Sequence, residues 1–295
     1  MTAVLVEAGP DAGAVWHLGD PVAEQRALER GAAAVDLGHR PVLRVGGPDR
    51  LTWLHTLTSQ HLLLLEPGQW AEALVLSPHG HVEHHLDLVD DGEAVWAHIE
   101  PGTADALLGY LDSMRFWSAV EVADVSAGFA VVRSYAGGGP VDEVVARADV
   151  GRVVAAFGAP AGMWAEEALR VAAGRPRLGF ETDHRTIPHE VGWIGSAVHL
   201  DKGCYRGQET VARVHNLGRP PRRLVLLHLD GSESLLPAHG DPVEQDGRAI
   251  GFVGTAVRHH ELGPIALALV KRSVPEDAPL TAGGVPAAQE PIVRA

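Results

Sequence analysis

The chain has 295 residues, of which 46% are hydrophobic and 21% are charged. This is the composition of a globular protein that can bury a substantial core and divide into two or more units. Its 38 acidic and 24 basic residues give a formal net charge of −14, which repels nucleic acid and makes direct nucleic-acid binding an unfavoured function.

The compartment is expected to be the reducing cytoplasm. The chain has one cysteine, which excludes an intrachain disulfide framework. Residues 1–7 lack a basic region, and acids follow at Glu7 and Asp11, unlike a signal peptide. No apolar run approaches the ~20 residues of a membrane helix, so we expect no membrane partner.

The first half of the chain predicts strands that alternate with single helices. Apolar spacing, with turns at Gly46–Pro48 and Ser77–Gly80, marks the boundaries. This order indicates α+β layering and not a regular βαβ array. The expected strands are 41–45, 71–76, 82–89, 94–99, 120–122 and 129–133, and the expected helices are 51–58 and 103–114.

The second half changes character near residue 220. Residues 137–140 are expected to be a flexible break, and residues 163–172 a helix. After 218–221, short strands at 223–229, 250–257 and 265–270, with a hairpin signal at Asp246–Gly247, favour a small antiparallel barrel or sandwich. We therefore predict two regions, residues 1–219 and 220–295.

Several common sites are absent from the sequence. It contains no G-x-x-x-x-G-K-[ST], no G-x-G-x-x-G after a strand, no C-x-x-C and no G-x-S-x-G. Nucleotide hydrolysis, classical dinucleotide binding, zinc-finger and α/β-hydrolase functions are therefore not expected.

The histidine-rich strand at 82–89 is expected to have one polar and one aliphatic face. Strand alternation predicts a solvated polar face and no metal site on it. His84 lies on the aliphatic side, where it needs a partner or a cavity. The polar face comprises His81, Glu83, His85 and Asp87.

Two further polar groups have less specific interpretations. The pair His259–His260, beside Glu261, is expected at the surface. The basic stretch fits a solvated interdomain crossing, or a patch that docks an anionic partner through guanidinium groups. That stretch contains Arg213, Arg219, Arg222 and Arg223.

The only cysteine lies in the segment Lys202–Glu209, among glycines and polar side chains. A core cysteine normally has apolar neighbours. Gly203 and Gly207 permit a tight backbone, and Lys202 and Arg206 are expected to favour the thiolate of Cys204. Tyr205 adds a flat face for a ring.

This octapeptide, continued by residues 210–213, resembles the K-G-C-Y-x-G-Q-E signature of YgfZ-type folate-binding proteins. These are relatives of the glycine-cleavage T-protein, an aminomethyltransferase. The resemblance spans roughly residues 35–275. It includes segments 45–50, 67–68, 169–176, 178–181, 188–190 with Trp193, 250–254 and 265–270.

The resemblance implies a fold, a ligand and a role. The fold is a three-subdomain ring around a central channel, in which two α+β subdomains precede a C-terminal antiparallel β-barrel. The ligand is tetrahydrofolate. The role is to assist assembly or repair of iron–sulfur enzymes, including those that modify tRNA, with the enzymes or an assembly scaffold as partners.

The same resemblance assigns the site residues. Cys204 is the reactive thiol, which acts as a nucleophile or holds a transient iron–sulfur cluster. Folate binding at the channel falls to six side chains: Lys202, Tyr205, Gln208, Glu209, His84 and Arg170.

The chain departs from the T-protein pattern at two positions. His84–His85 stands where T-proteins carry an adjacent acidic pair, and Ala172 stands where they carry the glutamate of R-x-E-A-G. The first difference argues against glycine cleavage. Two alternatives remain: a tetrahydrofolate-dependent aminomethyltransferase or demethylase with His84 as base, and an interaction scaffold that docks a partner on the basic stretch.

Overall fold

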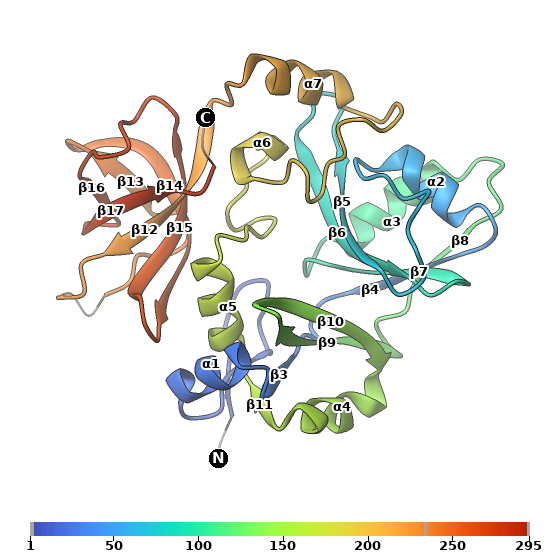
Figure 1. Ribbon diagram of the computed structural model, residues 1–295, viewed down its shortest axis with the longest axis horizontal. Coiled ribbons are helices and arrows are strands. Elements are labelled where there is room, and N and C mark those ends of the chain that lie inside the picture. Colours follow the sequence, from blue (N-terminus) through green and yellow to red (C-terminus); the bar gives the residue numbers. More distant parts are fainter. Residues whose placement is uncertain (1–2, 233–234, 294–295) are drawn as a thin grey trace.

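Three parts of the chain surround the segment that joins helices α5 and α6, as the computed structural model shows (Figure 1). The structure describes residues 3–232 and 235–293. The strands of the larger sheets are almost all antiparallel, which confirms the predicted α+β class. No helix in these two ranges is long and apolar enough to cross a membrane.

The first part is a five-stranded antiparallel sheet in the order β5-β6-β7-β4-β8. Helices α2 and α3 pack on one face, and their leucines join the sheet in one apolar core. The other face is turned toward the middle of the molecule (Figure 1). The elements are β4 (Val42–Gly46), α2 (Arg50–Leu57), β5 (Trp70–Leu76), β6 (Val82–Asp90), β7 (Ala94–Ile99), α3 (Ala104–Ser113) and β8 (Glu121–Asp124).

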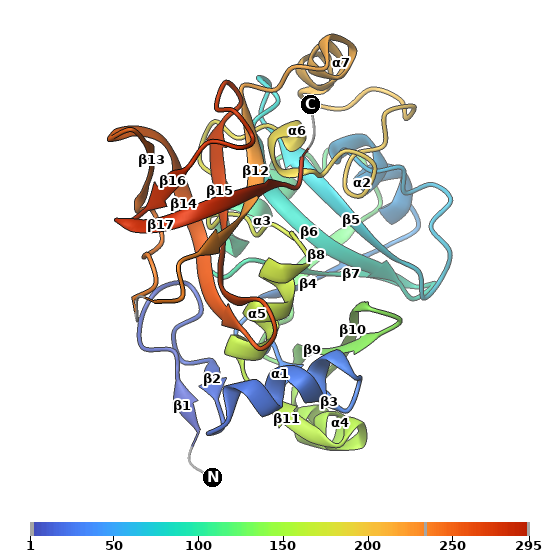
Figure 2. The same cartoon turned by 60° about the vertical axis from the view of Figure 1, so that its left-hand side comes forward.

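The second part is a four-stranded sheet in the order β10-β9-β3-β11, with a short β1–β2 pair beside it. Helix α5 packs between α1 and the barrel strand β14 (Figure 2). The elements are β1 (Val4–Leu5), β2 (Val15–His17), α1 (Pro21–Glu29), β3 (Ala33–Asp36), β9 (Phe129–Ala136), β10 (Gly139–Ala146), the 3-10 helix η1 (Arg147–Asp149), α4 (Val150–Phe157), β11 (Ala159–Ala161) and α5 (Met163–Ala172).

The third part is a closed six-stranded antiparallel barrel in the order β12-β15-β14-β13-β16-β17. Small and β-branched side chains fill its interior. The predicted hairpin at Asp246–Gly247 is confirmed, with both residues at positive φ between β13 and β14. The strands are β12 (Arg222–Leu229), β13 (Pro242–Gln245), β14 (Arg248–His259), β15 (Gly263–Lys271), β16 (Leu280–Ala282) and β17 (Val285–Pro291).

Two short helices, α6 (Pro188–Val191) and α7 (Gln208–Leu217), lie in the connection to the barrel. Gly207 precedes α7 with φ of 82°, and a Cβ atom there would lie 2.6 Å from the carbonyl oxygen of Ser77. The start of α7 is therefore held against the turn between β5 and β6.

The element predictions were wrong at two points. Residues 137–140 do not break the chain into separate parts, because Gly137 and Gly138 form the turn between β9 and β10, and Gly139 and Pro140 already pair in β10. No helix was predicted at the end of the octapeptide, where helix α7 begins. The domain boundary near residue 220 stays a prediction.

Candidate functional site

Two adjoining cavities lie where the three parts meet. Their volumes are about 280 and 410 Å³, and we refer to them together as the central cavity. Its wall combines β5 and β6 of the first part, β9 of the second and Ile292, which follows the barrel. Residues common to the two cavities are Glu72, Asp87, Arg133, Arg175 and Ser196.

The carboxylates of Glu72 and Asp87 lie side by side on this wall. The two residues are direct partners in the β5–β6 ladder, and His85 lies two positions before Asp87 on the same face. Glu72 Oε2 is 3.8 Å from His85 Nε2, and Asp87 Oδ2 is 3.9 Å from His85 Nδ1. We call these three residues the Glu72–His85–Asp87 cluster.

The imidazole of His85 is held firmly in this cluster. It stacks on the Trp193 indole with ring centroids 4.9 Å apart and planes 13° from parallel. Burial acts to lower the pKa of His85, but Asp87 and Glu72 outweigh it and raise that pKa above its ordinary value. The ring therefore favours a positive charge, in contact with a cavity that holds two carboxylates.

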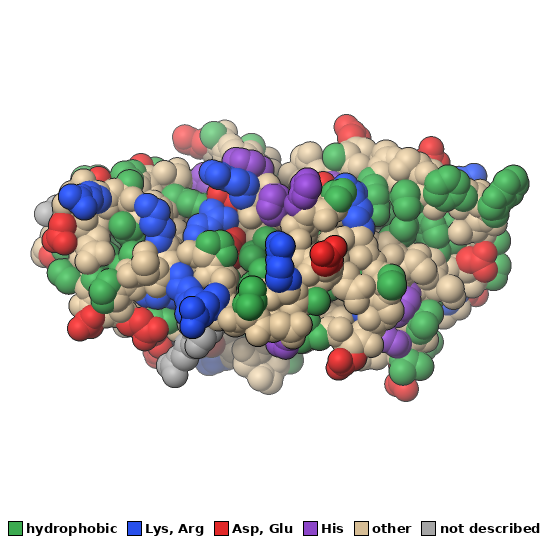
Figure 3. Space-filling view, turned by 90° about the horizontal axis from the view of Figure 1, so that it is seen from above, with side chains coloured by type: hydrophobic (Ala, Val, Ile, Leu, Met, Phe, Trp, Pro, Cys, Tyr) green, Lys and Arg blue, Asp and Glu red, His purple; other side chains and the backbone are tan. Residues whose placement is uncertain are grey.

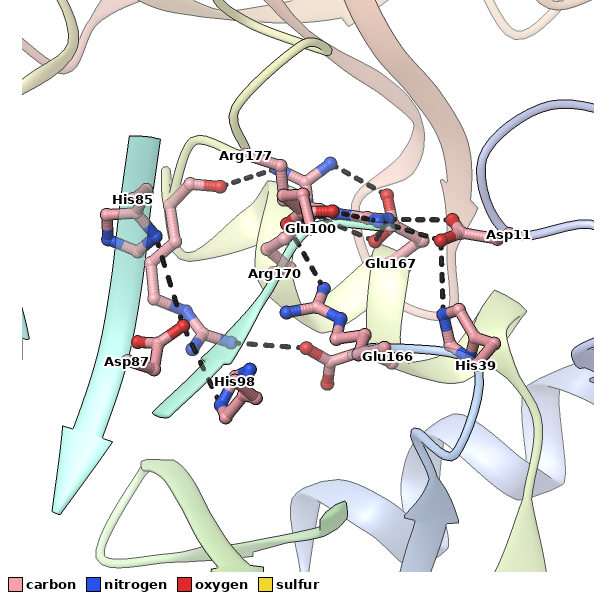
Figure 4. Close-up of polar contacts among 12 residues, drawn as sticks. Asp11, His39, His85, Asp87, His98, Glu100, Glu166, Glu167, Arg170 and Arg177 are labelled. Carbon is pink, nitrogen blue, oxygen red and sulfur yellow. Dashed lines mark hydrogen bonds and ion pairs between the residues drawn. The ribbon is translucent and has the colours of Figure 1, made fainter. Parts of the chain in front are cut away.

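Further polar contacts support Asp87, and Figure 4 shows the one with His98. His98, opposite Asp87 on β7, places Nε2 3.7 Å from Asp87 and 2.8 Å from Asp142. Arg133 pairs with Asp142 at 2.6 Å and with Glu166 at 2.8 Å. These contacts join the five-stranded sheet to β9, β10 and α5.

Arg170 lies in the cavity wall, but its guanidinium is committed to protein partners. It contacts Glu167 at 2.7 Å and Glu181 at 3.0 Å, and a further bond of 2.7 Å reaches the Thr255 hydroxyl. Figure 4 shows Arg170, which lies on α5, beside Arg177, which lies in the loop after that helix. Arg170 therefore holds the wall, and its predicted role as a folate ligand remains a prediction.

The guanidinium of Arg175 is less constrained by protein partners than that of Arg170. Its side chain is 30% exposed and lines both cavities. It donates to the Tyr135 hydroxyl at 2.7 Å and lies over that ring, while its Nε has no hydrogen-bond partner. It is a cation suited to an anionic group of a ligand.

Lys202 points away from the cavity. Its ammonium donates to the carbonyl oxygens of His55 and Thr58 at the end of α2, and burial lowers its pKa to about 8. It also lies 4.9 Å from the centroid of Tyr205, which packs in an apolar cluster with Trp193. Both residues stabilise the fold here and line neither central cavity.

Cys204 is a free, exposed thiol. Gln208 and Glu209 open helix α7, and none of the three lines the central cavity. Figure 3 looks down on the face that carries α7, where basic and histidine side chains gather near the middle. Exposed Arg213 and His215 belong to α7. The octapeptide thus forms outer surface and packing contacts.

The interpretation of the histidine-rich strand needs correction. His85 is buried and Asp87 is half-buried, so their face is not solvated, because it closes the central cavity against Trp193. His84 does lie on the aliphatic side, only 8% exposed, and burial lowers its pKa to about 4. The imidazole that lines the cavity is His85 and not His84.

The other two polar groups are also more buried than expected. His259 is 7% exposed, and its Nδ1 accepts from the backbone of the β14–β15 turn. Arg222 pairs with Asp183 and Glu190. Arg223 donates to carbonyl oxygens of residues 272 and 274. These two arginines fix the barrel, and only Arg213 and Arg219 of the stretch are exposed.

Sequence reasoning missed Glu72 and Arg175 as cavity residues. Glu72 interrupts an otherwise apolar strand, which is a usable signal of an interior polar contact. Arg175 lies in the segment that carries the family resemblance, but nothing in its local sequence shows its direction.

The fold is that of the glycine-cleavage T-protein. Aminomethyltransferase T of the glycine cleavage system from Bartonella henselae superposes with a TM-score of 0.81, 17% identity, and coverage of 97% of this chain and 92% of that one. Residues 222–285 match the model of the glycine cleavage T-protein C-terminal barrel domain.

Several sequence relatives point the same way. The Bacillus subtilis aminomethyltransferase is 24% identical over 86% of this chain and 83% of its own. That of Geobacillus kaustophilus is 38% identical over 39% of this chain and 31% of its own. A chloroplastic Arabidopsis thaliana protein named as a transferase is 23% identical, covering 76% of this chain and 62% of its own. Together these matches show similarity to aminomethyltransferases, strongest in short stretches of the chain, and a shared fold.

Proposed function

We propose that the chain binds tetrahydrofolate in the central cavity and serves as an accessory protein that maintains iron–sulfur enzymes, including enzymes that modify tRNA. The observation that carries the folate part is the cavity itself. Its polar wall is the kind of concave site that ligands of this size occupy, typically ~300–1,000 Å³.

The residues present fit a reduced folate. Trp70 offers an apolar face beside the cavity, on which a flat heterocycle can stack, and Trp193, which has one face covered by His85, lines the wall. Glu72 and Asp87 are acceptors for the N–H groups of a pterin. Arg175 is a donor for the glutamate carboxylates. When bound, the folate supplies a carrier for one-carbon groups.

The accessory role is supported by the octapeptide and by the exposure of its Cys204 thiol. An exposed thiol outside the cavity is accessible to a second protein, whereas a thiol that served the folate would line the cavity. The proposal therefore separates folate binding from a surface step at Cys204, either as a nucleophilic thiolate or as a transient cluster ligand.

The folate step is tested by titrating tetrahydrofolate while recording tryptophan fluorescence. We expect saturable quenching that is largely lost in Trp193→Phe and retained in Trp117→Phe, because Trp193 lines the cavity and Trp117 is fully exposed. Absence of saturable quenching, confirmed by calorimetry, would favour the interaction scaffold.

The accessory step is tested with Cys204→Ser in cells that lack the wild-type chain. We expect a several-fold loss of activity in a folate-coupled radical iron–sulfur enzyme at unchanged protein level, with folate binding intact. Normal enzyme activity at normal abundance would remove the thiol from the function.

A second candidate is a tetrahydrofolate-dependent aminomethyltransferase or demethylase. One observation favours it: Glu72 and Asp87 bring carboxylates to the cavity wall even though the adjacent acidic pair of T-proteins is replaced by His84–His85. Turnover across a panel of methylamine and aminomethyl donors, abolished in Asp87→Asn, would establish it in place of the accessory role.

A further inference from the structure

We propose that the Glu72–His85–Asp87 cluster binds a divalent first-row transition-metal ion. The inference uses only residues of this chain and does not depend on folate binding. One ligand atom from each residue lies within 4.8 Å of the others, and all three side chains come from one face of two adjacent strands.

The separations between the ligand atoms, all within 4.8 Å, are longer than those around a bound ion but can be closed by small movements. Glu72 Oε2 lies 3.8 Å from His85 Nε2. Zinc bonds of ~2.0–2.2 Å in a tetrahedral site place ligand atoms about 3.4 Å apart. Rotation of the Glu72 and Asp87 carboxylates, which are 37% and 23% exposed, can supply the remaining movement without disturbing the strands.

An unsatisfied donor atom points to a missing partner at this place. His85 is 9% exposed, and its Nε2 is buried without any hydrogen-bond partner. Buried imidazole nitrogens normally have one. Glu72 is the carboxylate near this nitrogen, whereas Asp87 lies near Nδ1, so an ion on Nε2 would bind Glu72 directly and Asp87 after its carboxylate turns.

The charges around the cluster also leave room for a cation. Within residues 3–232 and 235–293, the ion pairs of Glu72 and Asp87 are all with histidines, and Arg175 and Arg133 act on them only from beyond ion-pair distance. Nearby Arg133 is already balanced by Asp142 and Glu166. The cluster thus presents two carboxylates to one imidazole.

Supporting contacts resemble those that orient metal ligands. Trp193 stacks on His85 and fixes its ring plane. His98 lies 3.7 Å from Asp87 and is itself held by Asp142. Such outer contacts set ligand orientation and affinity in known metal sites.

The ligand types define the class of ion. One imidazole nitrogen with two carboxylate oxygens suits Zn²⁺, Mn²⁺, Fe²⁺ or Co²⁺, whereas Mg²⁺ and Ca²⁺ prefer oxygen ligands alone. Three protein ligands leave at least one coordination position open. That position faces the central cavity, so the ion would be able to hold water or a ligand atom there.

The test is a titration of the full-length, chelator-treated protein with metal alone. Co²⁺ is followed by its visible absorption and Zn²⁺ by calorimetry, without folate. We expect one ion per chain and at least a 10-fold weaker affinity in His85→Gln. His84→Gln is the matched control, because its side chain is adjacent in sequence but points to the opposite face of β6; its affinity should equal that of the wild type.

Two further variants keep the test decisive if His85→Gln does not fold. Glu72→Gln and Asp87→Asn change one atom each on partly exposed side chains, and each should also weaken binding at least 10-fold. A second group of histidines, His55, His61 and His199, is the competing metal site that the test must exclude. The ring centroid of His61 lies 4.8 Å from that of His55 and 5.3 Å from that of His199.

Two outcomes overturn the inference. In the first, no saturable binding occurs up to millimolar metal, and the cluster is then an internal ion pair of an imidazolium and two carboxylates. In the second, binding is lost in His61→Gln but persists in the variants of the cluster.

Discussion

The ammonium of Lys202 terminates helix α2 through the carbonyl oxygens of His55 and Thr58. A cation at a helix C-terminus also interacts favourably with the helix dipole. The lysine of the octapeptide is therefore explained by folding. Sequence alone could not show this contact of Lys202, because the end of α2 lies far away along the chain.

Lys202→Met is expected to destabilise the protein by about 1–3 kcal/mol, since two buried carbonyl oxygens lose their donor. Urea unfolding measures the change. Lys271→Met is the control, because Lys271 is exposed and its substitution should change the unfolding free energy by less than ~0.5 kcal/mol. Equal effects of the two variants would contradict the capping role.

His189 gives the protein a dependence on mild acid. Burial, and then the nearby His215, lower the pKa of His189 to about 4 from an ordinary 6.5. The unfolded chain thus binds this proton more readily. Stability should be complete above pH 6.5 and fall as the pH decreases toward 4.

In His189→Gln this decline between pH 6.5 and 4 should be shallower, whereas exposed His184→Gln should keep the wild-type profile. Thermal unfolding in a series of buffers provides the comparison. A profile unchanged in His189→Gln would show that another group controls this range.

The histidine pair at 84–85 illustrates how far single residues can be predicted. Strand alternation correctly separates the face of His84 from that of His85. It does not tell what covers each face, and the residue that covers His85 is Trp193, which is distant in sequence. Sequence alone therefore could not show that His85 is the member of the pair that lines the cavity.

Helices and strands with a clear periodicity of apolar residues were predictable from the sequence. Elements whose position is fixed by tertiary contacts were not. Helix α5 has the expected bounds, and the core strands β5, β6, β7, β12 and β15 match their apolar patterns. Helix α7 was missed because only Val211 is buried on it, so its apolar periodicity is weak. Its position comes instead from contact of Gly207 with the β5–β6 turn.

Gly207→Ala tests this contact at the level of the element. The added methyl group would meet the Ser77 oxygen at 2.6 Å and the Gly80 Cα at 2.9 Å, so we expect a loss of about 1–3 kcal/mol. Gly218→Ala has a similar positive φ but nothing within 4 Å. It should lose ~1 kcal/mol from strain alone, and urea unfolding of both variants separates clash from strain.

At the scale of the whole molecule, buried charges hold the first and second parts together. Arg177 contacts Asp11 near the N-terminus at 2.8 Å, Glu100 after β7 at 2.6 Å and Glu167 on α5 at 2.9 Å. The general ring and barrel could be predicted from the family resemblance. This joint could not, because its members come from three distant segments.

Arg177→Met is expected to cost about 3–5 kcal/mol, because it leaves buried carboxylates without their partner. The exposed pair of Arg152 and Asp149 gives the control Arg152→Met, which should cost no more than ~1 kcal/mol. Chemical unfolding compares them, and similar losses would show that Arg177 is not a joint.

The same joint predicts acid sensitivity. Burial acts to raise the pKa of Glu100, but Arg40 and Arg177 outweigh it and lower that pKa to about 2 from an ordinary 4.5. Its stabilisation is thus present above pH 4.5 and lost as the pH falls toward 2. Arg177→Met should show a shallower decline over this range in the same unfolding series.

The distance along the chain between Asp11 and Arg177 has a consequence for biosynthesis. A ribosome delivers Asp11 and Glu100, with their nearer partners His39 and Arg40, long before Arg177, which completes the neutralisation. Until Arg177 is available, burial of these carboxylates carries a desolvation cost. The sheets of the nascent first half therefore cannot pack together around them. Chaperone dependence should accordingly be greatest for ribosome-bound chains that end before residue 177 has emerged.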